Sequence, residues 1–155
     1  MNLIESQIHL VKGLDPIADA FEGTVYSDIV DVSCWKHVCF VMYIGVGTTG
    51  TSTLTVVPVS NIAAGASGTA VSFEYRECLT GDTWTAETTA ATFTTTAGSS
   101  KMVSIELDTD AIQASGYQYC RLSCVQSVDS ACLGCLFIIL SEPRYAQAVA
   151  ASAID

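Results

Sequence analysis

The chain has 155 residues, of which 16 are acidic and 6 are basic, giving a formal net charge of −10 at pH 7. So acidic a protein is not expected to bind nucleic acid or an anionic membrane surface, because both contacts need clustered Lys and Arg side chains. Its longest apolar runs, at 38–46 and 133–140, are far shorter than the roughly 18 residues of a membrane span.

The first 23 residues differ from the rest of the chain and predict an extended arm. Gly13 and Pro16 interrupt any long regular element there. The arm has too little apolar surface to fold alone, so we expect it to gain order by lying across a neighbouring protein. No basic region precedes an apolar one, so we expect no signal peptide and synthesis in a cytoplasm. The candidate contact residues of the arm are Ile4, Ile8, Leu10 and Leu14.

From residue 24 onward the pattern predicts strand after strand. The expected strands lie at 24–32, 36–46, 51–60, 69–78, 101–107, 117–128 and 132–141. The Thr- and Ala-rich stretch at 83–96 is either a loose strand or a long loop. One short helix can be capped by Asp108 or Thr109 and ended by Gly116.

This spacing predicts an all-β chain with a single β-sandwich or jelly-roll-like barrel domain. We place the β domain at 24–142, between the N-terminal arm at 1–23 and a short C-terminal tail at 143–155.

The segment from His37 to Phe73 contains no Asp, Glu, Lys or Arg. A solvated sheet face usually carries some charge, so these strands are either covered on both sides by the chain itself or covered by a partner. Thr and Ser alone can also solvate a face. We expect these strands to contribute to a contact between subunits, with Leu54 and Val56 as the candidate residues.

Seven cysteines is a high count, and an odd number cannot all pair within one chain. They are Cys34, Cys39, Cys78, Cys120, Cys124, Cys132 and Cys135. Cysteines of a cytosolic protein are commonly small buried hydrophobes, whereas disulfides form after release into oxidising surroundings. We expect at least one oxidised pair, which links Cys34 or Cys39 to the strands that carry Cys120 to Cys135.

Two sequence motifs match known binding signatures, but the elements expected around them do not fit those sites. The segment GVGTTG at 45–50 matches GxGxxG, but a strand follows it where a dinucleotide site needs a helix, which favours a glycine-rich turn. Cys132 and Cys135 form a CxxC with no second close pair, which disfavours a zinc site. The CxxC also runs into an apolar strand, which disfavours thiol redox chemistry. We therefore expect no enzyme activity, no cofactor and no metal.

Several short segments of turn and strand residues occur together in the chain: FEGTVYSD at 21–28, GVGTTGTSTLTV at 45–56, FEYR at 73–76, TGD at 80–82, AGS at 97–99, GYQYCRL at 116–122 and LSEPRY at 140–145. Together, over about residues 14–146, they resemble the small decoration, or cement, proteins of tailed-bacteriophage heads. The resemblance implies a compact β protein without enzymatic activity.

The same resemblance implies a homotrimer on the outer surface of the virion. There it would staple neighbouring subunits of the major capsid protein against the pressure of the packaged DNA. The partners implied are the major capsid protein and further copies of this chain. The N-terminal arm is then expected to contact the capsid or an adjacent trimer, and to lie outside the trimer core.

A second hypothesis is a β-sandwich binding module on the virion surface that recognises host carbohydrate. Exposed aromatic side chains grouped in one loop would favour it. The candidates are Trp35, Trp84 and Tyr117, which are scattered in the sequence.

Overall fold

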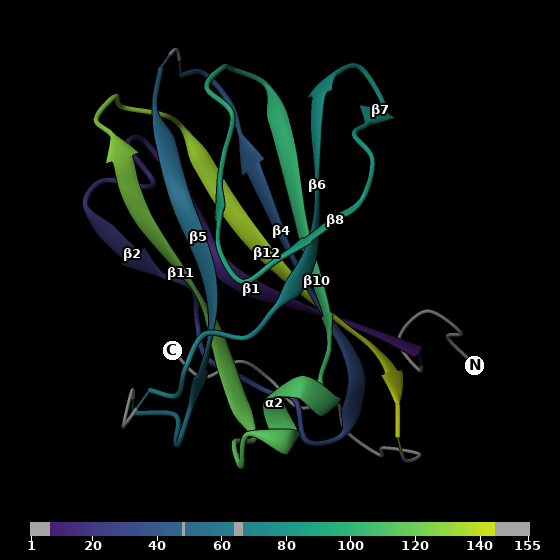
Figure 1. The fold of residues 1–155 in the computed structure, drawn as a ribbon. Helices are drawn as coiled ribbons and strands as arrows, with labels where there is room; N and C mark the ends of the chain where they lie inside the picture. Colours follow the sequence, from purple (N-terminus) through teal and green to yellow (C-terminus); the bar gives the residue numbers. More distant parts are fainter. Residues whose placement is uncertain (1–6, 48, 64–66, 145–155) are drawn as a thin grey trace.

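The computed structural model describes residues 7–47, 49–63 and 67–144, which form two antiparallel β-sheets packed face to face (Figure 1). Sheet A contains, in order, β1 (Ile8–Ile17), β12 (Gly134–Pro143), β4 (Trp35–Ile44), β10 (Lys101–Asp108), β6 (Phe73–Thr80) and β7 (Thr83–Trp84), with β8 (Thr88–Ala90) also paired to β6. Sheet B contains, in order, β2 (Thr24–Tyr26), β11 (Tyr119–Val128), β5 (Thr51–Val59) and β9 (Phe93–Thr94), with β3 (Val30–Asp31) also paired to β11. The β-sandwich predicted from the strand spacing is confirmed.

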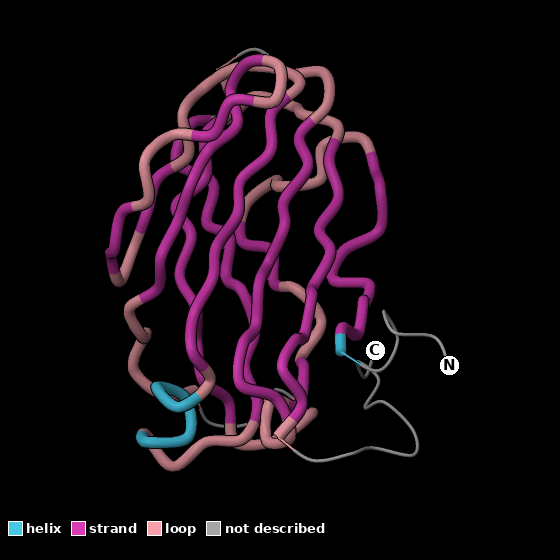
Figure 2. The backbone as a smooth tube through the Cα atoms, turned by 90° about the vertical axis from the view of Figure 1, so that its right-hand side faces the viewer, coloured by secondary structure: helices cyan, strands magenta, loops and turns pink. Residues whose placement is uncertain are grey.

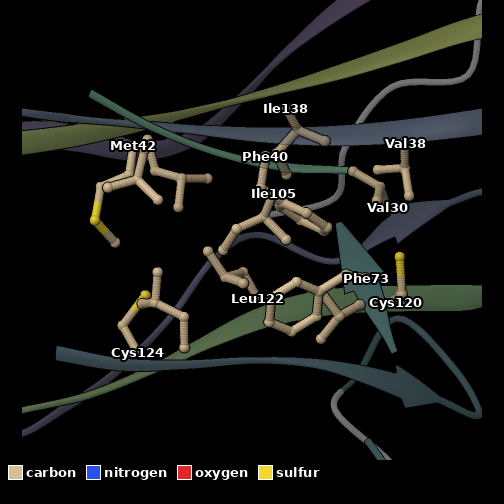
Figure 3. Packing of buried hydrophobic residues seen from close by; sticks show 14 of the residues in the cluster. Val30, Val38, Phe40, Met42, Phe73, Ile105, Cys120, Leu122, Cys124 and Ile138 are labelled. Atoms are coloured by element: carbon tan, nitrogen blue, oxygen red, sulfur yellow. The ribbon is translucent and has the colours of Figure 1, made fainter. Parts of the chain in front are cut away.

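The core lies between the two sheets and takes alternate residues from each strand. On β4, Val38, Phe40 and Met42 point inward and are buried. On β11, Leu122 points toward them from sheet B, where it lies between two inward-facing cysteines (Figure 3). Each such side chain contributes roughly 1.5–3 kcal/mol when it leaves water, which makes this layer the main source of stability.

The prediction that residues 1–23 form an arm separate from the β domain is wrong for the residues of β1. These residues pair with β12, from Ile8 opposite Ser141 to Ile17 opposite Gly134. Gly and Pro exclude a helix here, but an edge strand tolerates both. Gly13 is the extra residue of a bulge, and a Cβ at this position would lie 2.2 Å from Leu136 Cδ2. Residues 1–6 of the arm, including Ile4, lie outside the described residues.

The stretch at 83–96 connects the two sheets through short strands. β7 and β8 pair with β6 in sheet A, whereas β9 pairs with β5 in sheet B. The expected strand at 24–32 is likewise divided, into β2 and β3. The tube in Figure 2 shows these strands in magenta, with pink loops joining them. Both stretches thus form strands, but each strand is too short to show a clear alternation of apolar and polar residues.

The predicted short helix is confirmed as α2 (Asp110–Ala114), at one end of the sandwich (Figure 2). The Asp108 carboxylate accepts a hydrogen bond from the Asp110 N–H at 3.0 Å, and Gly116 follows with φ of 85°. Arg144 ties the end of sheet A to this helix, because its guanidinium donates to the Thr109 hydroxyl at 3.1 Å and pairs with Asp110. The expected tail is therefore anchored at Arg144, and 145–155 lie outside the described residues.

If β1 belongs to the sandwich, neighbouring residues on it must respond differently to the same substitution. Val11 is buried, whereas the side chain of Leu10 is 63% exposed. We expect Val11→Asp to lower the free energy of unfolding by about 3 kcal/mol or more, because a carboxylate would lose its water inside the core. The matched control Leu10→Asp should cost less than about 1 kcal/mol. Urea unfolding measures both, and equal effects would show that β1 is not docked.

Candidate functional site

The outer face of sheet A carries a continuous apolar surface. Residues directly opposite each other in an antiparallel sheet share a face. The register therefore aligns Leu10 with Ile139, Phe137 with Val41, and Tyr43 with Met102, in neighbouring rows across β1, β12, β4 and β10. Leu10, Tyr43 and Phe137 are exposed, and the other three are half-buried. We call this surface the outer patch, and its residues are Leu10, Val41, Tyr43, Met102, Phe137 and Ile139.

Carboxylates border the outer patch on the side of β10 and β6. Glu106 on β10 lies directly opposite Glu74 on β6, and both are exposed. Neither forms an ion pair with any residue that the structure describes. Asp108 lies two residues further along β10, opposite His37 on β4. On this side the apolar surface is therefore flanked by carboxylates that form no ion pair within the described residues.

Two hollows lie at this border. One, of about 200 Å³, is lined by Val41, Arg76, Trp84 and Ser104, and it adjoins the outer patch at Val41. Arg76 in this hollow pairs with Glu87. The other, of about 390 Å³, is lined by residues that include His37, Glu74, Glu106 and Asp108. Across the ranges that the structure describes, no three His, Cys, Asp or Glu side chains gather closely enough to hold a metal ion.

The expected subunit contact through Leu54 and Val56 is not possible. Both side chains have 0% exposure, because they point from β5 into the core. The outward face of the same strand carries Thr53, whose hydroxyl hydrogen-bonds those of Thr94 at 2.9 Å and Ser127 at 2.7 Å. The outward face of this uncharged strand is thus solvated by Thr and Ser hydroxyls, which is one of the alternatives given in the sequence analysis. The alternation of side chains along the sequence divides β5 into two faces, but it does not indicate which face is turned toward the core.

The arm residues separate into two groups. Ile8 and Leu10 are exposed on β1, and Leu10 belongs to the outer patch. Leu14 is half-buried and packs against the core, so it is less accessible to a partner than the arm prediction assumed.

All seven cysteines lie in the described residues, and none of them forms a disulfide. Cys39 faces outward on sheet A, where its sulfur lies 3.4 Å from the Ser104 hydroxyl oxygen. Cys120 and Cys124 face the core from sheet B. A bond from Cys39 to either is excluded, because sheet A itself lies between them. An oxidised pair that involves Cys34, or that links Cys39 to Cys132 or Cys135, stays a prediction.

The remaining cysteines also have separate surroundings. The Cys78 thiol donates to the Gly81 carbonyl at 3.1 Å. Cys132 belongs to the core cluster, whereas Cys135 shares the outer face of sheet A with Tyr43. The two cysteines of the CxxC therefore point to different sides of the sheet, which disfavours a redox pair.

Two ionisable side chains of opposite charge, Lys101 and Glu77, are buried in sheet A. Lys101 is buried, and its Nζ has no hydrogen-bond partner among the described residues. Burial lowers the pKa of Lys101, and the nearby Glu77 charge acts in the opposite direction. The Glu77 carboxylate is held by the N–H and hydroxyl of Thr96, at 2.9 and 2.6 Å. Sequence alternation could have found Lys101, because it occupies the same set of positions as Val103 and Ile105.

The aromatic candidates for carbohydrate binding do not meet. Trp35 is buried and stacks on His9 with ring centroids 6.1 Å apart. Trp84 lies on β7, whereas Tyr117 follows α2 at the opposite end of the sandwich (Figure 1). No specific observation therefore favours the carbohydrate-binding hypothesis.

The outer patch itself was not identified in the sequence, although a signal for it was present. The runs at 38–46 and 133–140 are apolar at odd and even positions alike, which is typical of strands covered on both faces. β4 and β12 come from these runs, and within the described chain only their inner face is covered by the second sheet.

No helix in the described part of the chain is long and apolar enough to cross a membrane. A scan against models of protein families finds no match, and a comparison with curated proteins also finds none.

Among solved structures, the fold is similar to that of the SPBc2 prophage-derived protein YomS, with a TM-score of 0.50 and 8% identity. The alignment covers 87% of this chain and 93% of that one, and it shows a shared fold. Two structures of infectious bursal disease virus, one of the Gx strain and one of T=1 particles, give TM-scores of 0.29 and 0.26 at 7% identity. They cover 88% and 94% of this chain and 42% of each viral chain, and scores this low carry no structural argument.

The buried thiols predict how the stability of the reduced protein depends on pH. Burial raises the pKa of Cys120 and of Cys124 from 9.0 to about 12. Between pH 9 and 12 the unfolded chain releases protons that the folded chain keeps. The free energy of unfolding should therefore fall as pH rises, by up to about 1.4 kcal/mol per pH unit for each thiol.

Urea unfolding of the reduced protein at pH 8.5 and 10.5 measures this fall. The double variant Cys120→Ala/Cys124→Ala should show a shallower fall than the unmodified chain, because all other titrating groups are common to both. Equal slopes in the two proteins would contradict the assignment.

Proposed function

We propose that this chain is a structural protein of a phage virion, which decorates the outer surface of the capsid as a homotrimer and holds neighbouring subunits of the major capsid protein together. The observation that carries the proposal is the outer patch, a rigid apolar surface on an acidic protein with a formal net charge of −10. Contiguous apolar surface of this kind on a soluble protein usually serves a contact with another protein.

The phage context is supported by two likenesses of different kinds. The turn and strand segments over residues 14–146 resemble head decoration proteins. Independently, the fold is similar to that of YomS, a protein described as derived from the SPBc2 prophage. The first likeness concerns the sequence and the second the architecture.

Charge supports the outer surface of the capsid over its interior. The chain carries a formal charge of −10 at pH 7. An acidic protein is repelled by the phosphates of packaged DNA, which bind clustered Lys and Arg. A place between shell and DNA would therefore be electrostatically unfavourable. The trimer rests on the resemblance, and outward-facing side chains must make its contacts because Leu54 and Val56 are enclosed.

The proposal predicts that the chain binds assembled shells. Empty shells of the major capsid protein encoded in the same phage genome are mixed with the labelled chain and sedimented through a sucrose cushion. We expect the chain to pellet with the shells at a fixed saturating ratio and to raise the temperature at which they disrupt. Excess unlabelled chain, added first, is the control for specific sites. A chain that remains in the supernatant at every concentration would contradict the proposal.

Light scattering on the free chain tests the oligomer separately. We expect a mass three times the 16.3 kDa of one chain. A monomer that nevertheless binds shells would retain the decoration role and overturn the trimer.

A further inference from the structure

We propose that the outer patch is the docking surface of this protein, and that it recognises a protein surface with an apolar centre bordered by Lys or Arg side chains. The inference deepens the proposed function, on which it rests for identifying that partner as the capsid. It places the contact on sheet A rather than on sheet B or on a detached arm.

The size of the patch suits a specific contact. Its residues occupy neighbouring rows on strands about 4.8 Å apart, and same-face residues along a strand are about 6.8 Å apart. Six positions at this spacing cover roughly 200 Å². The adjoining hollow beside Trp84 extends the surface toward the few hundred Å² at which an apolar patch on a monomer often has a function. The three most exposed side chains, Leu10, Tyr43 and Phe137, come from three adjacent strands.

The patch is also formed before any partner arrives. β12 pairs with β1 on one side and β4 on the other, and β4 pairs with both β12 and β10. The backbone of β12 and of β4 under the patch is therefore held by hydrogen bonds on both sides. Because little has to be ordered on binding, most of the apolar contact is available for affinity.

The carboxylates beside the outer patch determine which kind of partner surface can bind there. Glu74 and Glu106 face each other across β6 and β10, and like charges directly opposite in a sheet repel. A Lys or Arg side chain from a partner would relieve this repulsion as it docked. A second copy of this chain would instead bring a body of charge −10 against the same carboxylates. The border therefore favours a basic partner surface over self-association.

The hollow of about 200 Å³ beside the outer patch can accept a side chain of the partner. Val41 contributes to both the patch and this hollow, and Trp84 forms another part of its wall. An apolar side chain of the partner could pack there against Trp84, which is 37% exposed in this chain. Aromatic side chains in such positions are frequent sites of strong binding energy.

A pair of matched substitutions tests the docking face. Phe137 on sheet A and Val125 on sheet B are 42% and 43% exposed, and each points outward from its sheet. We expect Phe137→Asp to weaken binding to empty shells at least tenfold, and Val125→Asp to leave it unchanged. Circular dichroism and urea unfolding establish that both variants are folded.

A second pair tests the charged border. Glu74→Lys/Glu106→Lys should weaken shell binding and make it less sensitive to salt. Glu22→Lys/Asp129→Lys alters the net charge equally at exposed positions outside the patch, and should preserve both the affinity and the salt dependence. Equal effects of the two double variants would overturn the role assigned to Glu74 and Glu106.

The outcomes separate this inference from the proposed function. Failure of the unmodified chain to bind shells would refute the proposed function. Normal binding by Phe137→Asp with loss of binding by Val125→Asp would place the contact on sheet B and overturn the inference alone. Conversion of an oligomer to a monomer by Phe137→Asp, seen by light scattering, would show that the patch joins copies of this chain instead.

Discussion

The pleat of a β-strand sends successive side chains to opposite faces, and β4 and β12 are apolar at both sets of positions. The core between the sheets uses one set, which includes Phe40 and Ile138. The other set, which includes Val41 and Phe137, has to face outward because the backbone permits no other direction. Two strands that supply side chains to the core, β4 and β12, are therefore also strands that carry the exposed apolar surface.

Because successive side chains point to opposite faces, packing of the core also fixes the arrangement of the outer patch. The inward side chains fix the position of β4 and β12, and the outward side chains are thereby held in a fixed array. Sheet B differs, because β5 presents Thr53 and Thr55 to solvent on the face opposite the buried Leu54. The two outer surfaces of one sandwich thus have different chemistry: the outward face of β5 in sheet B is hydroxyl-rich, whereas the outer patch of sheet A is apolar with an acidic border.

The fold could be predicted from the sequence because the period-two alternation is strong in the long strands and turn residues separate them. The strand β1 could not, because Gly13 and Pro16 argue against regular structure in general and do not reveal an edge strand. The inward direction of Val56 and the separation of Cys39 from Cys120 depend on which face is enclosed. Alternation alone leaves that choice open, since both faces of β4 are apolar and both faces of β5 are uncharged.

Electron cryomicroscopy of shells saturated with the chain would show directly how the sandwich is oriented on a capsid. We expect density on the outside of the shell with sheet A turned toward it, Tyr43 and Phe137 in the contact, and Lys or Arg side chains of the capsid protein beside Glu74 and Glu106. Density in which the outer face of sheet B meets the shell, or in which the chain lines the interior of the shell, would be incompatible with docking through the outer patch.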